Sequence, residues 1–311
     1  MEFQRADDAR RLFFEMPKPE LHLHLDGSLD PALALELAAS RNVDAPRDWA
    51  EMRAALVAPE RCADQADLLR AFDLPIALLQ DAEALDRAAE QLVRAKAAEN
   101  VAYLEMRWGP HLHTAKGLTQ TQVIAAVAAG ARRAAAETGI EVRLIVTALR
   151  SHSMEENRDL ATAAVAAQDL GVVAFDLAGR EADFPDPLTF KESFDIARNG
   201  GLAITLHAGE WGGAAQVRRA LDVQPARIAH GGVAVEDPSL CADLAARNVS
   251  LDLCPTSNTQ AAIVAGYGDF PIAELRRRGV PITLNTDDLV VSDVTLSEEY
   301  LNVHRRLGLP V

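Results

Sequence analysis

The sequence has 311 residues, of which 49% are hydrophobic and 25% are charged, and its formal net charge is −15. This composition is ordinary for a globular protein, and the length can build one large hydrophobic core. The negative charge makes a nucleic-acid duplex or an anionic membrane surface an unfavourable partner, but it does not exclude a small neutral substrate.

The three cysteines, Cys62, Cys241 and Cys254, are far apart and form no CxxC pair. This pattern favours a reducing compartment over a disulfide framework. The segment MEFQRADDARRLFFEM at the amino terminus lacks the apolar run of a signal peptide, and no stretch approaches the roughly 18 apolar residues of a membrane span. We therefore expect a soluble, cytoplasmic protein that binds neither nucleic acid nor membranes, of unknown oligomeric state.

Short apolar runs alternate with longer stretches rich in alanine and leucine. The runs predict eight strands, at 21–25, 101–108, 142–149, 172–179, 202–209, 227–231, 249–255 and 280–288. Helical spacing occurs between them, for example at 119–138, 155–169, 211–222 and 236–247. Eight strands that alternate with helices predict an α/β protein, a (β/α)8 TIM-type barrel that forms a single domain over residues 1–311.

The gap between the first two predicted strands, residues 29–100, is much longer than one crossover helix requires. Insertions of this size are usually functional. We expect several helices there, packed over one mouth of the barrel as a partial lid.

Polar side chains follow most of the predicted strands. His22 and His24 stand two residues apart, so their side chains share one face of the first strand. Later strands end in FDLAG, HAGE, AHGG, CPTSN and NTDD, which contain Asp176, His207, Glu210, His230, Asp287 and Asp288.

The carboxyl ends of barrel strands meet at one mouth, where barrel active sites lie. Taken singly, each of these residues has an ordinary alternative: an aspartate that caps a helix, or a hydrogen-bonded core histidine. Six of them at the same end of one barrel favour a shared site: His22, His24, His207, His230, Asp287 and Asp288. Imidazole nitrogens and a carboxylate are good zinc ligands, and a nearby carboxyl group can move protons. The residues themselves therefore predict metal-assisted hydrolysis.

The segments PKPELHLHLDGSL, YLEMRWGPHLHTAKGLT, FDLAG, TLHAGE, RIAHG, LCPTSN and ITLNTDD occur in this order along nearly the whole chain. Together they resemble the adenosine deaminase family, whose members are zinc-containing barrels that hydrolyse the exocyclic amine of adenine-type rings and release ammonia. The resemblance implies one Zn²⁺ per chain, with His22, His24, His207 and Asp287 as its ligands.

The same resemblance assigns roles around the substrate. It implies that Glu210 protonates N1 of the purine, and that His230 orients the attacking water. Asp288 would hold that water and contact N7. Three further residues are expected beside the substrate: His24, the backbone of Gly179 at N3, and Asp26 at the ribose 5′-hydroxyl.

Asp26 bears on the choice of substrate. Relatives that act on the free base tend to have Glu at this position, and those that act on nucleotides tend to have Asn. We therefore expect hydrolytic deamination of adenosine or a related 6-aminopurine nucleoside. Free adenine, or a 5′-modified or other aminopurine nucleoside, remains the alternative. One departure from the family is Leu289, which follows the aspartate pair where Pro is usual.

Two other classes of protein fit less well. A non-catalytic binding protein that kept the fold would be expected to have damaged ligands, yet every proposed ligand and Glu210 are present. A nucleic-acid deaminase of the cytidine type uses an HxE motif with PCxxC. Neither motif occurs in this sequence.

Overall fold

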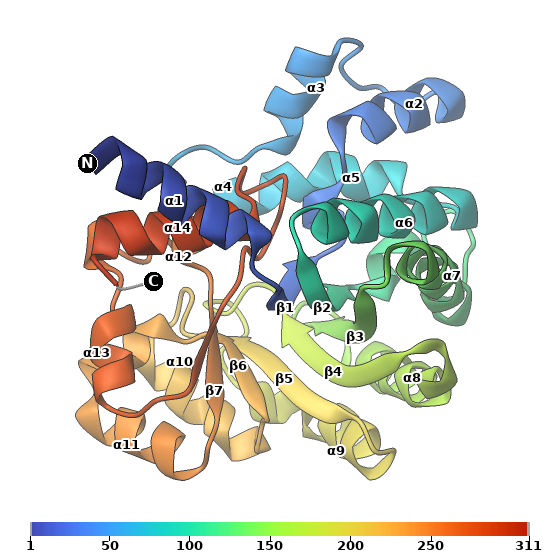
Figure 1. Ribbon diagram of the computed structural model, residues 1–311. Helices are drawn as coiled ribbons and strands as arrows, with labels where there is room; N and C mark the ends of the chain where they lie inside the picture. Colours follow the sequence, from blue (N-terminus) through green and yellow to red (C-terminus); the bar gives the residue numbers. More distant parts are fainter. Residues whose placement is uncertain (1, 310–311) are drawn as a thin grey trace.

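In the computed structural model, which describes residues 2–309, eight parallel strands pair in chain order from β1 to β8. They are β1 (Lys18–His24), β2 (Val101–Trp108), β3 (Glu141–Leu149), β4 (Val172–Ala178), β5 (Ala203–Ala208), β6 (Arg227–His230), β7 (Ser250–Leu253) and β8 (Ile282–Leu284). Helices surround this sheet (Figure 1), so the protein is a (β/α)8 barrel and the predicted fold is confirmed.

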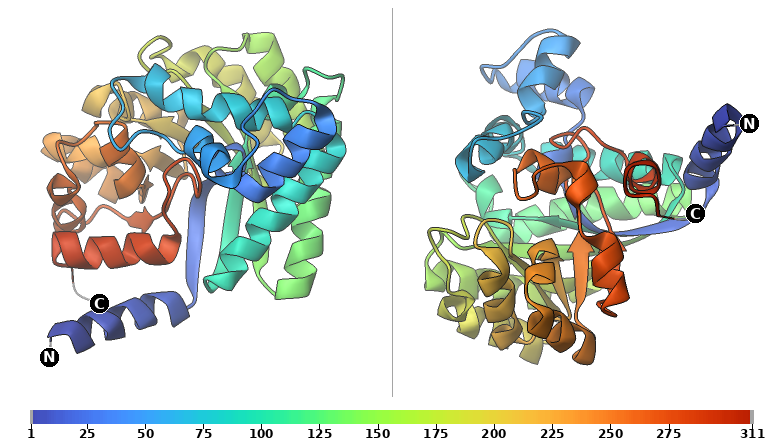
Figure 2. Two further views of the ribbon diagram at one scale, coloured as in Figure 1. Left: turned by 90° about the horizontal axis from the view of Figure 1, so that it is seen from above. Right: turned by 90° about the vertical axis from the view of Figure 1, so that its left-hand side faces the viewer.

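Helical structure follows each of the strands β2 to β8. These helices are α7 (Gln120–Thr138), α8 (Met154–Ala166), α9 (Lys191–Asn199), α10 (Gly213–Ala220), α11 (Pro238–Ala246), α12 (Pro255–Gln260), α13 (Ile272–Arg277) and α14 (Leu296–Leu307). A helix before the barrel, α1 (Glu2–Glu15), lies alongside α14, where Phe13 packs with Tyr300 and Leu301 (Figures 1 and 2). Of the helices in the described part of the chain, none is long and apolar enough to cross a membrane.

The eighth strand is much shorter than the sequence predicts. The apolar pattern extends it over 280–288, but the structure ends it at Leu284. Asp287 has a φ of 70°, in the left-handed region that extended strands do not use. Regular strand structure therefore stops at Leu284, and Asp287 pairs with β1 through a single isolated bridge to Leu23.

Five helices lie between β1 and β2: α2 (Pro31–Arg41), α3 (Trp49–Leu56), α4 (Gln65–Leu69), α5 (Asp73–Leu78) and α6 (Ala82–Ala98). The last, α6, packs closely against α7, because a Cβ on Gly130 would lie 2.0 Å from the carbonyl oxygen of Asp86. Figures 1 and 2 show α2 and α3 standing out from the barrel, on the side away from α11.

The helices of this insertion are fastened to the loops after β7 and β8. Main-chain hydrogen bonds run from Cys62 N to Gln260 O (2.7 Å) and from Ala58 N to Val291 O (3.0 Å). Beside them is a small apolar cluster, separate from the main core: Ala58, Cys62, Leu68, Ala71, Ala261 and Val291, with Phe72, Trp211 and Ile263 at its edge. The insertion therefore rests on the same strand ends that carry the predicted site.

A buried ion cluster ties β1, α6 and β8 together. Lys96 Nζ lies 2.8 Å from Glu20 Oε2 and 2.5 Å from Glu99 Oε1, and its side chain is fully buried. The other oxygen of Glu20 accepts hydrogen bonds from the backbone N–H and hydroxyl of Thr286. Lys96 therefore pairs with two carboxylates where the first and last strands meet, and a second buried ammonium, on Lys18, donates to the backbone carbonyl of Glu99.

We predict that Lys96→Met lowers the free energy of unfolding by about 3–5 kcal/mol, because it leaves buried carboxylates without their cation. Urea unfolding followed by circular dichroism measures the change. Lys116→Met, which removes the same charge from an exposed position, is the control and should change stability by less than about 0.5 kcal/mol. Equal losses in the two variants would contradict this account.

Candidate metal centre and active site

The barrel closes through the predicted metal ligands themselves. The backbone N–H of His24 donates to Asp287 O (2.7 Å), and the N–H of Asp287 donates to His22 O (3.1 Å). Asp287 therefore sits in register between the two histidines of β1. Just below it, Asn285 Oδ1 accepts from the backbone N–H groups of Leu21 and His22. Residues at opposite ends of the sequence thus become neighbours at one mouth of the barrel.

Four side-chain atoms converge at this mouth. His24 Nε2 lies 3.3 Å from His22 Nε2, 3.2 Å from His207 Nε2 and 3.4 Å from Asp287 Oδ1. His22 Nε2 is 2.9 Å from the same Asp287 oxygen. Ligands about 2.0–2.1 Å from a tetrahedral zinc ion lie about 3.3–3.4 Å from one another. The spacing and the donor set therefore fit a zinc-sized dication.

Burial keeps His22 and His24 in the form that binds metals. It lowers the pKa of His24 to about 4 and that of His22 well below its usual range, although the carboxylate of Asp287 acts in the opposite direction. Metal ligation requires neutral imidazole. Burial also lowers the pKa of His207, but the charge of Asp176 and its hydrogen bond more than offset this, so that pKa is raised and a metal bound there would displace a proton.

His230 lies at the edge of this group. Its donor atoms fall within 4.8 Å of those of His22, His207 and Asp287, so it could belong to a metal-binding set by proximity alone. Its Nε2 is, however, 3.9 Å from Asp287 Oδ2 and 3.9 Å from Glu210 Oε1. This position, between the carboxylate of the cage and that of Glu210, suits a group that handles a water molecule.

Two site residues have an unusual backbone. His230 has φ of 64° and Asp287 has φ of 70°, a region that non-glycine residues rarely adopt. Such conformations cost about 1–3 kcal/mol and persist where the surrounding structure enforces them. Both residues stand directly at or after the end of a strand, where this twist turns the side chain toward the barrel axis.

A second layer of polar side chains orients the first. Asp176 Oδ2 lies 3.1 Å from His207 Nδ1, which leaves the Nε2 lone pair of His207 free for a metal. Ser257 donates to Asp287 Oδ2 (2.6 Å), and Asn258 Nδ2 is 2.9 Å from His230 Nδ1. FDLAG and CPTSN mark strand ends in the sequence, but the pattern alone does not predict the contacts of these three side chains.

Glu210 and Asp288 are two buried acids on the cavity side. Burial is the main reason that the pKa of Glu210 is raised, and nearby carboxylates add to it. Burial also raises the pKa of Asp288 well above its usual range, together with the charges of Asp287 and Asp26. Within the described structure, Asp288 Oδ1 is buried and has no hydrogen-bond partner. Both groups are thus suited to hold or exchange a proton.

Asp26 lies deeper than an ordinary rim residue. It is 3% exposed, and its carboxylate faces His113 Nε2 at 3.8 Å and His24 Nδ1 at 4.0 Å. Its Oδ1 has no hydrogen-bond partner among the described residues. His113 Nδ1 lies 2.9 Å from Leu79 O on the insertion side. An unpaired buried oxygen of this kind can accept a hydrogen bond from a hydroxyl group of a ligand.

These groups open into one cavity of about 280 Å³. On the barrel side it is lined by His24, Asp26, Gly109, Thr147, Gly179, His207, Glu210, His230, Asp287 and Asp288. On the other side lie Gln65, Leu68, Leu69, Phe72 and Ile76 from the insertion. The volume is near the lower end for ligand pockets, so it suits a small molecule held between a polar floor and an apolar cover.

The glycine of the HLDGS segment is required by close packing. A Cβ on Gly27 would lie 1.6 Å from Asp288 Oδ1. The backbone of Gly27 also accepts hydrogen bonds from Val290 N and Val291 N. The end of β1 therefore serves as the surface against which the second aspartate of NTDD is seated.

Leu289, where the family usually has Pro, makes a bond that proline cannot. Its backbone N–H donates to Ser28 Oγ (3.0 Å), and Ser28 Oγ donates to His24 O (2.5 Å). Proline has no N–H group. The departure from the family therefore adds a link between the loop after β8 and the end of β1.

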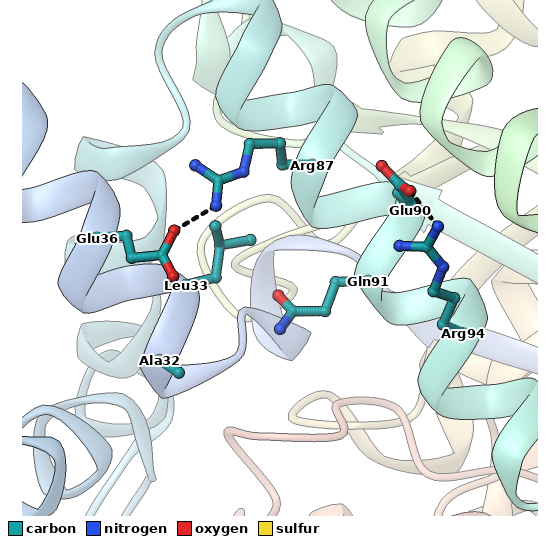
Figure 3. Close-up of a pocket in the computed structure, with 7 residues that line it drawn as sticks. All are labelled: Ala32, Leu33, Glu36, Arg87, Glu90, Gln91 and Arg94. Atoms are coloured by element: carbon teal, nitrogen blue, oxygen red, sulfur yellow. Dashed lines mark hydrogen bonds and ion pairs between the residues drawn. The ribbon is translucent and has the colours of Figure 1, made fainter.

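A second hollow lies apart from this mouth, between α2 and α6 (Figure 3). Its sides are ion pairs, Arg87 with Glu36 and Arg94 with Glu90. None of its seven lining residues belongs to the candidate site. Because the charged groups of this hollow are already paired with one another, they do not indicate a second reactive centre.

A TIM-type barrel with three imidazoles, a carboxylate and further acids at the carboxyl ends of its strands defines a metal-binding barrel hydrolase.

Comparison with known proteins gives the family. The family model described as "Adenosine deaminase" matches residues 17–310. An adenosine deaminase from Enterococcus faecalis is 36% identical over 93% of this chain and 86% of its own length. Among solved structures, an adenine deaminase from Arthrobacter aurescens has a TM-score of 0.87 and 27% identity, covering 94% of this chain and 89% of its own. A zinc-bound amidohydrolase from Burkholderia ambifaria also has a TM-score of 0.87 and 27% identity, covering 97% of this chain and 83% of its own.

The chain belongs to the adenosine deaminase family. It is a hydrolytic deaminase on an amidohydrolase-type barrel, and the resemblance read from its motifs is confirmed.

We predict that Gly27→Ala lowers kcat for ammonia release by about 100-fold, because the new methyl group displaces the Asp288 carboxylate by more than an ångström. Metal content should stay at the wild-type value, since Asp288 is outside the four-atom cage. Gly268→Ala is the control: a Cβ there meets no atom within 4 Å. Wild-type turnover in Gly27→Ala would show that the position of the Asp288 carboxylate against Gly27 is not required for catalysis.

Proposed function

We propose that this protein is a zinc-dependent adenosine deaminase that converts adenosine, or a closely related 6-aminopurine nucleoside, to the 6-oxo product and ammonia. The observation that carries the proposal is the cage of His22, His24, His207 and Asp287, whose separations match a tetrahedral zinc ion, at the floor of a nucleoside-sized cavity. When bound, the ion supplies hydroxide at neutral pH, because it lowers the pKa of water to roughly 7.

The remaining residues divide the proton transfers between them. Glu210, whose pKa is raised mainly by burial, donates a proton to N1 of the purine and so makes C6 more electrophilic. Asp288 and His230 orient the attacking water from the cavity side, and Asp288 contacts N7. The amine then leaves as ammonia after it gains a proton, and the ring keeps the oxygen of the water at C6. Gly179 N–H faces N3 at the end of β4.

The cavity charge favours a nucleoside over a nucleotide. Five acidic side chains line it, on Asp26, Asp73, Glu210, Asp287 and Asp288, against one guanidinium, on Arg180. The raised pKa values of Glu210 and Asp288 favour their neutral forms and Asp287 belongs to the cage, so Asp26 and Asp73 are the carboxylates that remain to face a ligand. Arg180 already pairs with Asp183 (2.6 Å). A 5′-phosphate near Asp26 would face a buried carboxylate, whereas a 5′-hydroxyl can donate to its unpaired Oδ1.

Free adenine is the second candidate substrate. The structural similarity to the adenine deaminase of Arthrobacter aurescens supports it. Asp26 argues against it, because a free base would leave that buried oxygen without a donor.

We expect protein purified with about one zinc per chain to release ammonia from adenosine and deoxyadenosine much faster than from adenine or from adenosine 5′-monophosphate. Chelation should abolish the activity, and added Zn²⁺ should restore it. Metal analysis measures the zinc content, and a coupled ammonia assay measures the activity on each substrate. Faster turnover of adenine than of adenosine would establish the second candidate instead.

Asp26→Ala tests the basis of this preference. It should lower kcat/KM for adenosine by at least about 10-fold and leave the value for adenine within about twofold, because adenine has no 5′-hydroxyl. Asp169→Ala removes the same charge from an exposed site outside the cavity, and it should change kcat/KM for neither adenosine nor adenine. Equal losses on nucleoside and base would remove the argument from Asp26.

Glu210→Gln should lower kcat by about 10²–10⁴-fold, the usual contribution of a positioned acid, because glutamine cannot give up a proton to the ring. Metal content and KM should change little, since Glu210 is not part of the cage. The measurement is steady-state kinetics with metal analysis on the same preparation. A near-normal rate in this variant would disprove the acid role.

A further inference from the structure

The segment that carries Glu210 is held by a buried carboxylate to which the proposed reaction gives no task. Glu181 lies in the loop after β4 and is 2% exposed. Its Oε1 accepts from Gly209 N (2.8 Å), and its Oε2 accepts from the N–H groups of Glu210 (3.1 Å), Trp211 (2.9 Å) and Gly212 (2.9 Å). Four consecutive backbone donors therefore converge on one carboxylate.

This arrangement sets the backbone of the segment. Successive N–H groups that point to one centre form a concave anion site, and such a turn uses left-handed residues; here Gly209 has φ of 78°. A Cβ on Gly209 would lie 2.4 Å from Val217. Four charge-assisted bonds hold a turn that the chain would not otherwise favour. Glu210 lies inside this turn, so the position and direction of its Cα–Cβ bond are fixed.

Arg150 holds the same segment from the other side. Its guanidinium, 1% exposed, donates to His207 O (2.9 Å) and to Phe184 O (2.8 Å). One contact lies at the end of β5 and the other in the loop that carries Glu181. The cation therefore ties the two loops together, and its positive charge offsets the cost of burying the Glu181 carboxylate.

We propose that Glu181 is a positioning residue for the deamination: by accepting the four N–H groups of residues 209–212, it aims the Glu210 carboxyl group into the cavity. This inference rests on the proposed role of Glu210 as the proton donor. It gives Glu181 no contact with the substrate or with the metal ligand side chains. Its effect on catalysis must therefore pass through Glu210.

A double-mutant cycle tests this dependence, using whichever 6-aminopurine substrate the wild-type enzyme turns over. We expect Glu181→Gln to lower kcat by about 30–100-fold with KM and metal content near wild type, since an amide opposes some of the N–H donors. In a Glu210→Gln background, Glu181→Gln should cause less than a twofold further loss. Glu181→Asp, which keeps the charge, should recover part of kcat. This variant keeps the test valid if the glutamine variant does not fold.

Glu105→Gln is the matched control, because Glu105 is also a buried, ion-paired carboxylate but lies on β2 and contacts Arg227 instead. Any effect it has on kcat should persist unchanged in the Glu210→Gln background. Three results would overturn the proposal: full kcat in Glu181→Gln, the same loss in both backgrounds, or loss of metal in proportion to activity. A near-normal rate in Glu210→Gln alone would instead disprove the acid role on which the inference rests.

Discussion

The site depends on how the barrel closes. Asp287 exchanges main-chain hydrogen bonds with His22 and His24, so the closing contact between the first and last strands also sets the metal-binding cage. The regular part of β8 ends at Leu284. Asp287 then forms a single bridge with Leu23 of β1, and its carboxylate lies beside the two imidazoles. The Lys96 cluster secures the same pair of strands from below.

The chemistry of the mouth follows from burial as much as from residue type. Burial keeps the imidazoles of His22 and His24 neutral, so that they can bind a metal. It also raises the pKa of Glu210 and Asp288, which favours their protonated forms. The same burial thereby favours neutral imidazoles at His22 and His24 and protonated acids beside them.

Much of this could be predicted from the sequence, because the barrel repeats one unit and because polar residues end otherwise apolar strands. The eight strands and the family are confirmed, and the structure brings the predicted ligands together at one mouth; the assigned roles remain predictions. The end of β8 was missed, since an apolar pattern does not reveal a left-handed residue. Glu181, Arg150, Ser257 and Asn258 were missed because their contacts join loops distant in sequence, which periodicity cannot detect.

The manner in which the insertion is attached has a consequence for evolution and engineering. The reactive groups stand on barrel strand ends, whereas the apolar cover of the cavity comes from Leu68, Leu69, Phe72 and Ile76. The helices that carry this cover also contribute to the main core, for example through Leu37 and Leu78, so they cannot be exchanged as a block without loss of core packing. The four cover residues themselves are not among the strand-end groups. Substitutions at these four positions therefore offer a route to new substrate range that leaves the strand-end groups in place.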